Sequence, residues 1–204
     1  TDKSLWGYGL NDVGLLGDTN EDNIESPVKI ANNVKKVQSG LYHSVFLKTD
    51  GSVWTLGANF EGQLGVEKSI SKSMKPNKIM ENISDIFAGG SATFAIDSYG
   101  KLWRWGTNNS MKVGGNKDFL LYQPTEYING VRAVQSHWGF NLVLKEDSTL
   151  WIYGETEEQR ENSTEVHNLT GGIPIELSVK IMDDVNSLSD WVMFDYHKTL
   201  ILKN

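Results

Sequence analysis

The apolar residues of this 204-residue chain fall in short runs that are separated by turn-forming residues. The run VWTLG at 53–57 is typical, because Asp50-Gly51 precedes it and a stretch rich in Gly and Asn follows it. No segment sustains the i, i+3, i+4 apolar spacing of an amphipathic helix. Short runs of β-branched and aromatic residues between turn signals predict strands instead. The pattern therefore predicts an all-β protein.

The same run returns four times along the chain. Its tryptophan is Trp6, Trp54, Trp103 and Trp151, at intervals of 48, 49 and 48 residues, and a glycine always follows three residues later. A proline recurs after each tryptophan, as Pro27, Pro76, Pro124 and Pro174. Self-similarity at a fixed period indicates a repeat architecture. We therefore divide one domain, 1–204, into four copies of about 49 residues, approximately 1–51, 52–100, 101–149 and 150–204.

Each copy contains enough short segments for four strands. In the first copy these end with a strand that carries the apolar pair Val34 and Val37, and with a closing strand that ends at Leu47. Asp50-Gly51 then predicts a tight hairpin into the next tryptophan strand. Four strands per repeat predict a β-propeller-type array of four blades. We expect the recurring tryptophans, Trp6, Trp54, Trp103 and Trp151, to form a structural core between neighbouring sheets.

The details of the motif distinguish between the families that build such blades. The Gly-His…Trp-Asp signature of WD repeats is absent, and the doublet Gly89-Gly90 does not recur as kelch repeats require. VWTLGANFEGQLG at 53–65 and SGLYHSVFLKTDG at 39–51 resemble the regulator of chromosome condensation (RCC1-type) repeat family. The resemblance covers nearly the whole chain and is weakest in the fourth copy, where the polar run 155–168 replaces the turn motif. It is specific for a fold and not for one activity.

The resemblance also raises the question of ring closure. Members of this family commonly close a ring of roughly seven blades, and four copies fill a little over half of it. Three arrangements fit: a fragment of a longer propeller, a compact ring with fewer blades, or a ring completed by dimerisation. An open arc leaves an apolar blade face and unpaired strand edges exposed. We therefore expect either a homodimer or further sequence outside these residues.

Composition excludes several classes of partner and cofactor. The formal net charge is −7 and no basic stripe is present, so we expect no nucleic-acid binding. The absence of cysteine excludes disulfides and thiolate metal sites. No apolar run approaches the roughly 18 residues that span a membrane, so we expect no membrane insertion. The abundance of Asn, Lys and Ile favours a bacterial source, and we expect an extracellular or cell-surface location.

The residues that carry chemistry are not grouped in any known catalytic pattern. His43 and His197 both precede a closing apolar strand, which favours a structural role for them. No HExxH motif and no Ser/His/Asp order at motif spacing is present. The acidic loop 18–23 lacks the central Gly and the twelfth-position Glu of a calcium loop. We therefore expect no enzyme activity, no cofactor and no metal.

Loops that connect the apolar-pair strand to the closing strand carry aromatic residues and should share one face. Exposed aromatics are favoured interface anchors. The alternative is that they complete the core or line the central channel. The candidate partner-binding residues are Tyr42, Trp138, Phe140, Trp191, Phe194 and Tyr196. Phe60 and Asp12, in the other loop set, are weaker candidates.

These features favour a non-catalytic protein–protein interaction scaffold, as a bacterial secreted or surface repeat module. Two alternatives stay open. Aromatics on a propeller face can stack on sugars, which suits a carbohydrate-binding module. The resemblance also includes propeller-type inhibitors of bacterial enzymes such as β-lactamases. The guanine-nucleotide exchange role known in the family is disfavoured by the small number of copies and the lack of a basic tail.

Overall fold

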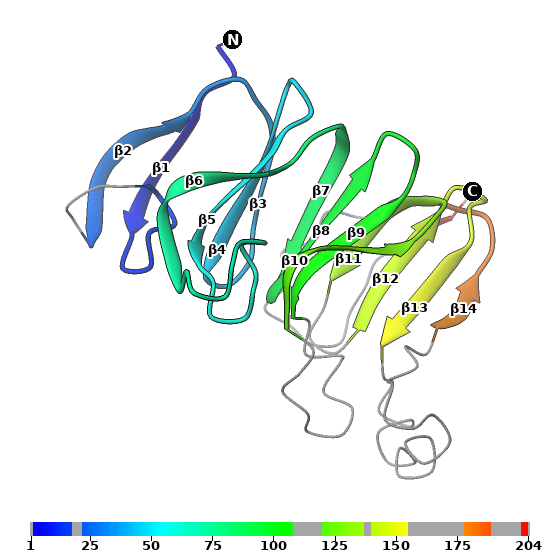
Figure 1. Cartoon of the computed structure of the whole chain (residues 1–204). Coiled ribbons are helices and arrows are strands. Elements are labelled where there is room, and N and C mark those ends of the chain that lie inside the picture. The colour runs from blue at the N-terminus through cyan, green and yellow to red at the C-terminus, as the bar shows by residue number, and fades with distance from the viewer. Residues whose placement is uncertain are drawn as a thin grey trace.

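The strands pair into three four-stranded antiparallel sheets and two two-stranded sheets (Figure 1). The structure is a computed structural model that describes residues 2–17, 22–107, 120–136, 140–154, 178–188 and 201–203. Within these residues every regular element is a strand. The predicted all-β class is thereby confirmed.

Each sheet follows chain order, so every strand pairs with its sequence neighbours. The N-terminal half-blade pairs β1 (Leu5–Leu10) with β2 (Asn23–Ala31). The first blade contains β3 (Val34–Ser39), β4 (His43–Lys48), β5 (Val53–Ala58) and β6 (Lys72–Met80). The second blade contains β7 (Ile83–Gly89), β8 (Ser91–Asp97), β9 (Leu102–Thr107) and β10 (Leu121–Ile128). The third blade contains β11 (Val131–Ser136), β12 (Phe140–Lys145), β13 (Leu150–Gly154) and β14 (Ser178–Met182), and the C-terminal half-blade pairs β15 (Val185–Leu188) with β16 (Ile201–Lys203).

A tight hairpin joins the end of one sequence copy to the start of the next. Between β4 and β5, Gly51 has a φ of 81°, in the left-handed region that glycine adopts without cost. Asp50 Oδ1 accepts hydrogen bonds from the Ser52 backbone N (2.9 Å) and from its Oγ (2.6 Å). Because β4 and β5 are neighbours, a blade combines the second half of one copy with the first half of the following copy.

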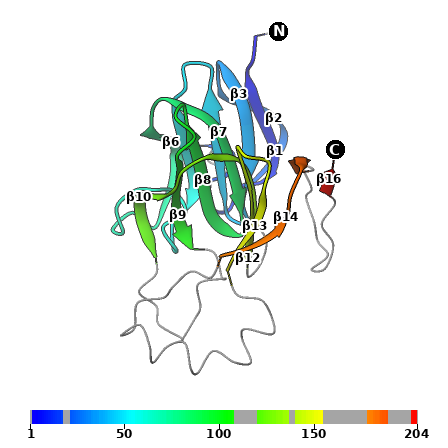
Figure 2. The ribbon, with the colours of Figure 1, turned by 90° about the vertical axis from the view of Figure 1, so that its right-hand side faces the viewer.

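The blades stand beside one another in an open arc (Figure 1). Their first strands, β3, β7, β11 and β15, contact one another in succession. Seen from the side, the sheets overlap as stacked layers (Figure 2). The two chain ends lie at opposite ends of the arc (Figure 1). The arrangement is that of a partial propeller whose sheets do not close.

Apolar clusters fill the space between successive sheets. One lies between the first and second blades and includes Val45 and Leu47 with Ile86 and Trp105. An equivalent cluster lies between the second and third blades. A smaller one joins the third blade to Val185 of β15. Each blade therefore buries one face against the preceding blade and the other face against the following blade.

The recurring tryptophans lie at the margin of these clusters and are not among the fully buried residues. Trp103 and Trp151 pack against the clusters while partly exposed, Trp54 is also partly buried, and Trp6 is 53% exposed. The indole Nε1 groups of Trp6, Trp54 and Trp151 donate to a hydroxyl two residues earlier, and that of Trp103 donates to Asp97. This polar anchor keeps one edge of the ring near water. The central position belongs instead to residues such as Trp105, which is 1% exposed.

Candidate functional site

Two sets of loops meet at one end of each blade. In the first blade, loop 40–42 connects β3 to β4 and loop 59–71 connects β5 to β6. They lie together because these strands are antiparallel neighbours, and the backbone N of Ala58 donates to the Tyr42 carbonyl (2.8 Å). We call this end of the array the loop rim. Phe60, which the sequence placed in a separate loop set, therefore lies at the same end as Tyr42.

The loop rim carries a group of exposed apolar side chains, which we call the rim surface. Its members are Leu10, Leu41, Tyr42, Phe60 and Ile70. Tyr42 is 53% exposed and Phe60 is 60% exposed. Exposed apolar side chains that gather at loop ends commonly mark a site for a partner.

Backbone contacts between blades connect these loops along the rim. The Leu41 backbone N donates to the Gly90 carbonyl of the next blade (2.9 Å). The Tyr122 hydroxyl, also from the next blade, donates to the Phe60 carbonyl (3.3 Å). On the other side, Ser44 Oγ donates to the Leu15 carbonyl of the N-terminal half-blade (3.4 Å). The rim surface is therefore continuous over three neighbouring sheets.

Buried asparagines hold the longer rim loops in shape. Asn59 is 1% exposed; its Oδ1 accepts from the Leu64 backbone N (3.1 Å) and its Nδ2 donates to the Ile70 carbonyl (2.8 Å). Asn11 repeats this arrangement with Leu16 N and the Gly17 carbonyl. The sequence suggested that these asparagines adopt left-handed turn conformations, but neither has a positive φ. They recur because their amides satisfy loop backbone groups that water cannot reach.

His43 fixes the beginning of β4 beneath the rim. Its ring is fully buried, and Nε2 shares a hydrogen bond of 2.8 Å with Thr93 Oγ1 of the next blade. Burial lowers its pKa to about 4, so the imidazole is neutral near pH 7. A Cβ on Gly40 would lie 2.1 Å from His43 Cε1, so only glycine fits at that position. His43 supports the loop bearing Tyr42 and does not face a ligand.

The remaining predicted contact residues lie elsewhere. Phe140 begins β12 at the loop rim. Trp138, Trp191, Phe194 and Tyr196 lie outside the described residues, as does His197. The interface role of all six predicted residues stays a prediction. Leu10 and Ile70 were not identified from the sequence; Leu10 could have been, because it continues the alternation of Trp6 and Tyr8 along β1.

A shallow cleft of about 370 Å³ lies between the second and third blades, at the end opposite the rim. Its charged lining residues are Asp85, Asp97, Arg132 and Glu146. The carboxylates already have structural partners: Asp85 pairs with Lys36 (2.7 Å), and Asp97 accepts from Trp103 and from backbone amides. Arg132 donates to the Val185 carbonyl (2.8 Å). These contacts tie blades together and leave no facing pair of carboxylates for acid–base chemistry.

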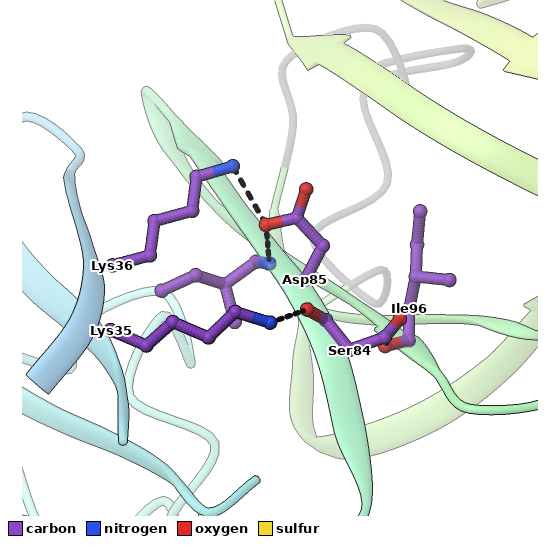
Figure 3. A network of polar contacts seen from close by, with 6 residues as sticks. Lys35, Lys36, Ser84, Asp85 and Ile96 are labelled. Carbon is purple, nitrogen blue, oxygen red and sulfur yellow. Dashed lines mark hydrogen bonds and ion pairs between the residues drawn. The ribbon is translucent and has the colours of Figure 1, made fainter. Parts of the chain in front are cut away.

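Polar contacts of the same kind join the first and second blades near the inner strands. Lys36 Nζ reaches Asp85 Oδ1, and Lys35 Nζ donates to the Ser84 carbonyl (3.0 Å) (Figure 3). The Lys36 ammonium also lies 4.4 Å from the centroid of the Phe87 ring. Among the described residues, no group of three or more His, Asp or Glu side chains could hold a metal ion. Likewise, no helix of the described residues is long and apolar enough to cross a membrane.

The sheets and their packing define a partial β-propeller repeat protein with an open arc of blades. Residues 2–47 and 50–96 match the family model described as regulator of chromosome condensation (RCC1) repeat, and residues 34–63 match a second model with the same description. The chain belongs to the RCC1-type repeat family. This confirms the resemblance found in the motif at 53–65 and in the closing segment 39–51.

Relatives with established names share part of the chain. It is 27% identical over 161 residues to the ultraviolet-B receptor UVR8 of Arabidopsis thaliana, covering 73% of this chain and 36% of the receptor. It is 33% identical over 165 residues to the probable E3 ubiquitin-protein ligase HERC6 of Homo sapiens, covering 74% of this chain and 16% of the ligase. The chain thus spans about a third or less of these relatives.

A solved structure supports the same fold. The crystal structure of Prp20p from Saccharomyces cerevisiae, described together with its binding to Gsp1p and histones, superposes with a TM-score of 0.57. The sequences are 23% identical, and the match covers 76% of this chain and 39% of Prp20p. At this identity the likeness concerns the fold alone.

Proposed function

We propose that the chain is a non-catalytic scaffold that binds another protein through the rim surface. The observation that carries this proposal is the group of exposed apolar residues on backbone that buried side chains hold in place. Asn59 and His43 fix the loops beneath Phe60 and Tyr42, so little ordering entropy is lost when a partner binds. Aromatic anchors on a rigid backbone are the typical centre of a protein interface.

The chemistry of the partner follows from the charge of the chain and from its relatives. A net charge of −7 favours a neutral or basic protein surface over nucleic acid. Prp20p, whose binding to Gsp1p and histones accompanies its structure, provides a precedent for protein partners in this fold. The composition rich in Asn, Lys and Ile supports a bacterial protein, and we propose that it is secreted or held at the cell surface. We also propose a second copy of the chain as a partner, at a surface separate from the rim.

A comparison of matched substitutions tests the rim. Tyr42→Ala and Phe60→Ala remove rim anchors, whereas Tyr99→Ala removes an 88% exposed tyrosine in the β8–β9 turn, at the opposite end of the blade. Partners are captured from bacterial surface extracts, identified by mass spectrometry and purified, and their affinity is measured by calorimetry. We expect each rim substitution to weaken binding by roughly 5- to 30-fold and the control to leave it unchanged.

Two results would reject the proposal. Equal affinity of all three variants would show that the rim surface is not the binding site. Binding to a glycan array that is lost in Tyr42→Ala, without any protein partner, would instead establish the carbohydrate-binding alternative.

A further inference from the structure

The two ends of the arc carry complementary halves of one blade. In every complete blade, the second strand pairs with the third, as β4–β5, β8–β9 and β12–β13. The N-terminal half-blade holds only strands of the third and fourth type, and the C-terminal half-blade only strands of the first and second type. We propose that two copies of the chain associate by pairing β16 of one copy with β1 of the other, which forms a four-stranded blade from two half-blades.

Side chains that are buried in complete blades are exposed at the N-terminal half-blade. Tyr8 is 72% exposed, although Leu56 and Trp105 at the same repeat position are 0% and 1% exposed. Trp105 is buried because it packs against the preceding blade, and β1 has no such blade before it. Val37 is 43% exposed, whereas Ile86 at its repeat position is fully buried. Both exposures mark the place of a missing strand pair and its neighbouring blade.

The residues before β1 already have the conformation of half a hairpin. Asp2 Oδ1 accepts from Ser4 N (3.1 Å) and Ser4 Oγ (2.8 Å), and Trp6 Nε1 donates to Ser4 Oγ (2.8 Å). The same three contacts occur at Asp50-Ser52-Trp54 in the β4–β5 hairpin. Lys3 has a φ of 49°, at the position that Gly51 occupies in that hairpin with a φ of 81°. Residues 2–6 are therefore shaped to follow a strand of the β4 type.

The register inside the C-terminal half-blade identifies β16 as a strand of that type. Val185 lies opposite Lys203 and Ser187 opposite Leu202, with a register shift between the two pairs. In the first blade, Val34 lies opposite Lys48 and Lys36 opposite Leu47, with the same shift. Among the described residues, β16 pairs only with β15, so its other edge is available for a strand such as β1.

The complete blades also fix the register of the proposed joint. Leu47 lies opposite Val53, and the equivalent pairs in the next two blades are Ile96 with Leu102 and Leu144 with Leu150. By this rule Leu202 of one copy lies opposite Leu5 of the other. Lys203 then takes the place of Lys48, whose ammonium lies 4.4 Å from the centroid of the Trp54 ring, and covers Trp6.

A second copy fits the geometry better than closure of one chain on itself. β1 and β16 belong to sheets at opposite ends of the arc (Figure 1). Three complete blades and two halves amount to four blades per chain, so two copies joined head to tail give eight, within the range of about 4–8 blades found in closed propellers. A head-to-tail interface that closes after two copies leaves no free edges.

Oligomeric state provides the first test, measured by light scattering on the full chain. We expect a mass of twice the 22.8 kDa chain for wild type. Tyr8→Asp should shift it to the monomer, because a carboxylate would be buried at the joint, while the fold survives since Tyr8 is exposed within one chain. Tyr99→Asp, an equally charged change in a complete blade, should stay dimeric, as should Tyr42→Ala at the rim. A wild-type monomer at micromolar concentration would overturn the proposal.

The absence of cysteine allows a test of register. Because Lys48 N donates to the Ser52 carbonyl, the adjacent Leu47–Val53 pair is a non-hydrogen-bonded pair with Cα atoms about 4.5 Å apart, within disulfide range. Leu5→Cys is mixed with tagged Leu202→Cys and oxidised, and with tagged Lys203→Cys as the matched control, whose side chain lies on the other face.

The expected product is a disulfide-linked heterodimer that forms with Leu202→Cys at least ten times faster than with Lys203→Cys. Equal rates for the two partners would reject the register. In the double variant Leu5→Cys/Leu202→Cys, a disulfide confined to one chain would reject association of two copies. Neither outcome affects rim binding, so failure of the joint and failure of the proposed function are distinguishable.

Discussion

Replacing Trp105 with alanine should destabilise the chain far more than replacing Trp54, although Trp54 belongs to the recurring motif. Trp105 is 1% exposed, and its Nε1 donates to the Gln63 carbonyl across the blade interface (3.0 Å). Complete burial removes about 200 Å² from water, or at most about 5 kcal/mol at 25 cal/mol/Å². Allowing for the compact unfolded chain and for the cavity left behind, we expect a loss of about 3–5 kcal/mol in the free energy of unfolding.

Trp54 makes fewer of the contacts that this free energy depends on. Its ring is partly exposed, lies beneath the Lys48 ammonium at 4.4 Å and donates to Ser52 Oγ (2.9 Å). Loss of a half-buried ring and one exposed cation–π contact should cost about 1–2 kcal/mol.

Urea unfolding followed by far-ultraviolet circular dichroism measures both variants without relying on tryptophan fluorescence. We expect the midpoint to fall substantially more for Trp105→Ala than for Trp54→Ala, with an unchanged m value. Equal midpoints, or a lower one for Trp54→Ala, would show that the blade interface does not depend on the buried position, and the assignment of the core would be refuted.

Two further predictions concern the supports of the rim. Because burial lowers the pKa of His43 from 6.5 to about 4, the unfolded state binds its proton first; stability should be complete above about pH 6.5 and fall by up to ~3 kcal/mol between pH 6.5 and pH 4, a loss that His43→Gln should abolish in urea titrations across that range. Asn59→Ala should leave loop amides unpaired and lower the free energy of unfolding by about 1–3 kcal/mol, whereas the exposed Asn23→Ala should change it by less than ~0.5 kcal/mol; equal costs would contradict the clamp role.

The strands were predictable because each depends on local signals. Apolar runs such as 53–57 and turn pairs such as Asp50-Gly51 specify a strand, a hairpin and a further strand without reference to distant residues. The period of the tryptophans then predicts that these units stack as blades. These parts of the fold are confirmed because local propensity and the repeat period point to the same structure.

The depth of individual side chains was less predictable. The motif tryptophan recurs because its Nε1 caps the hairpin before it, and this hydrogen bond keeps it at the margin of the core. Trp105 occupies a position filled by Leu56 in the previous blade and Tyr153 in the next, so no conserved residue type identifies it within the chain. Burial there depends on the facing blade, which periodicity along one chain does not describe.

The rim was only half predictable for a related reason. Tyr42 was identified from its loop, but the proximity of Phe60 depends on antiparallel pairing, which brings loops from alternate hairpins to one end of the sheet. The alternation of chain direction in a four-stranded meander could have given this placement from the strand count alone.

The position of the blade boundary shows how the repeat period and the folded unit can differ. A period has no natural origin, so a copy can be counted from any of its residues. The Asp50-Gly51 hairpin decides the matter physically, because a two-residue turn forces β4 and β5 into one sheet. The division between sheets must then fall between β2 and β3, at 32–33, rather than at the hairpin that ends a sequence copy. Cutting the array at a copy boundary divides a sheet and leaves two complementary halves. This is why the exposed residues of β1 match buried residues elsewhere, and why the free edges of β1 and β16 fit each other.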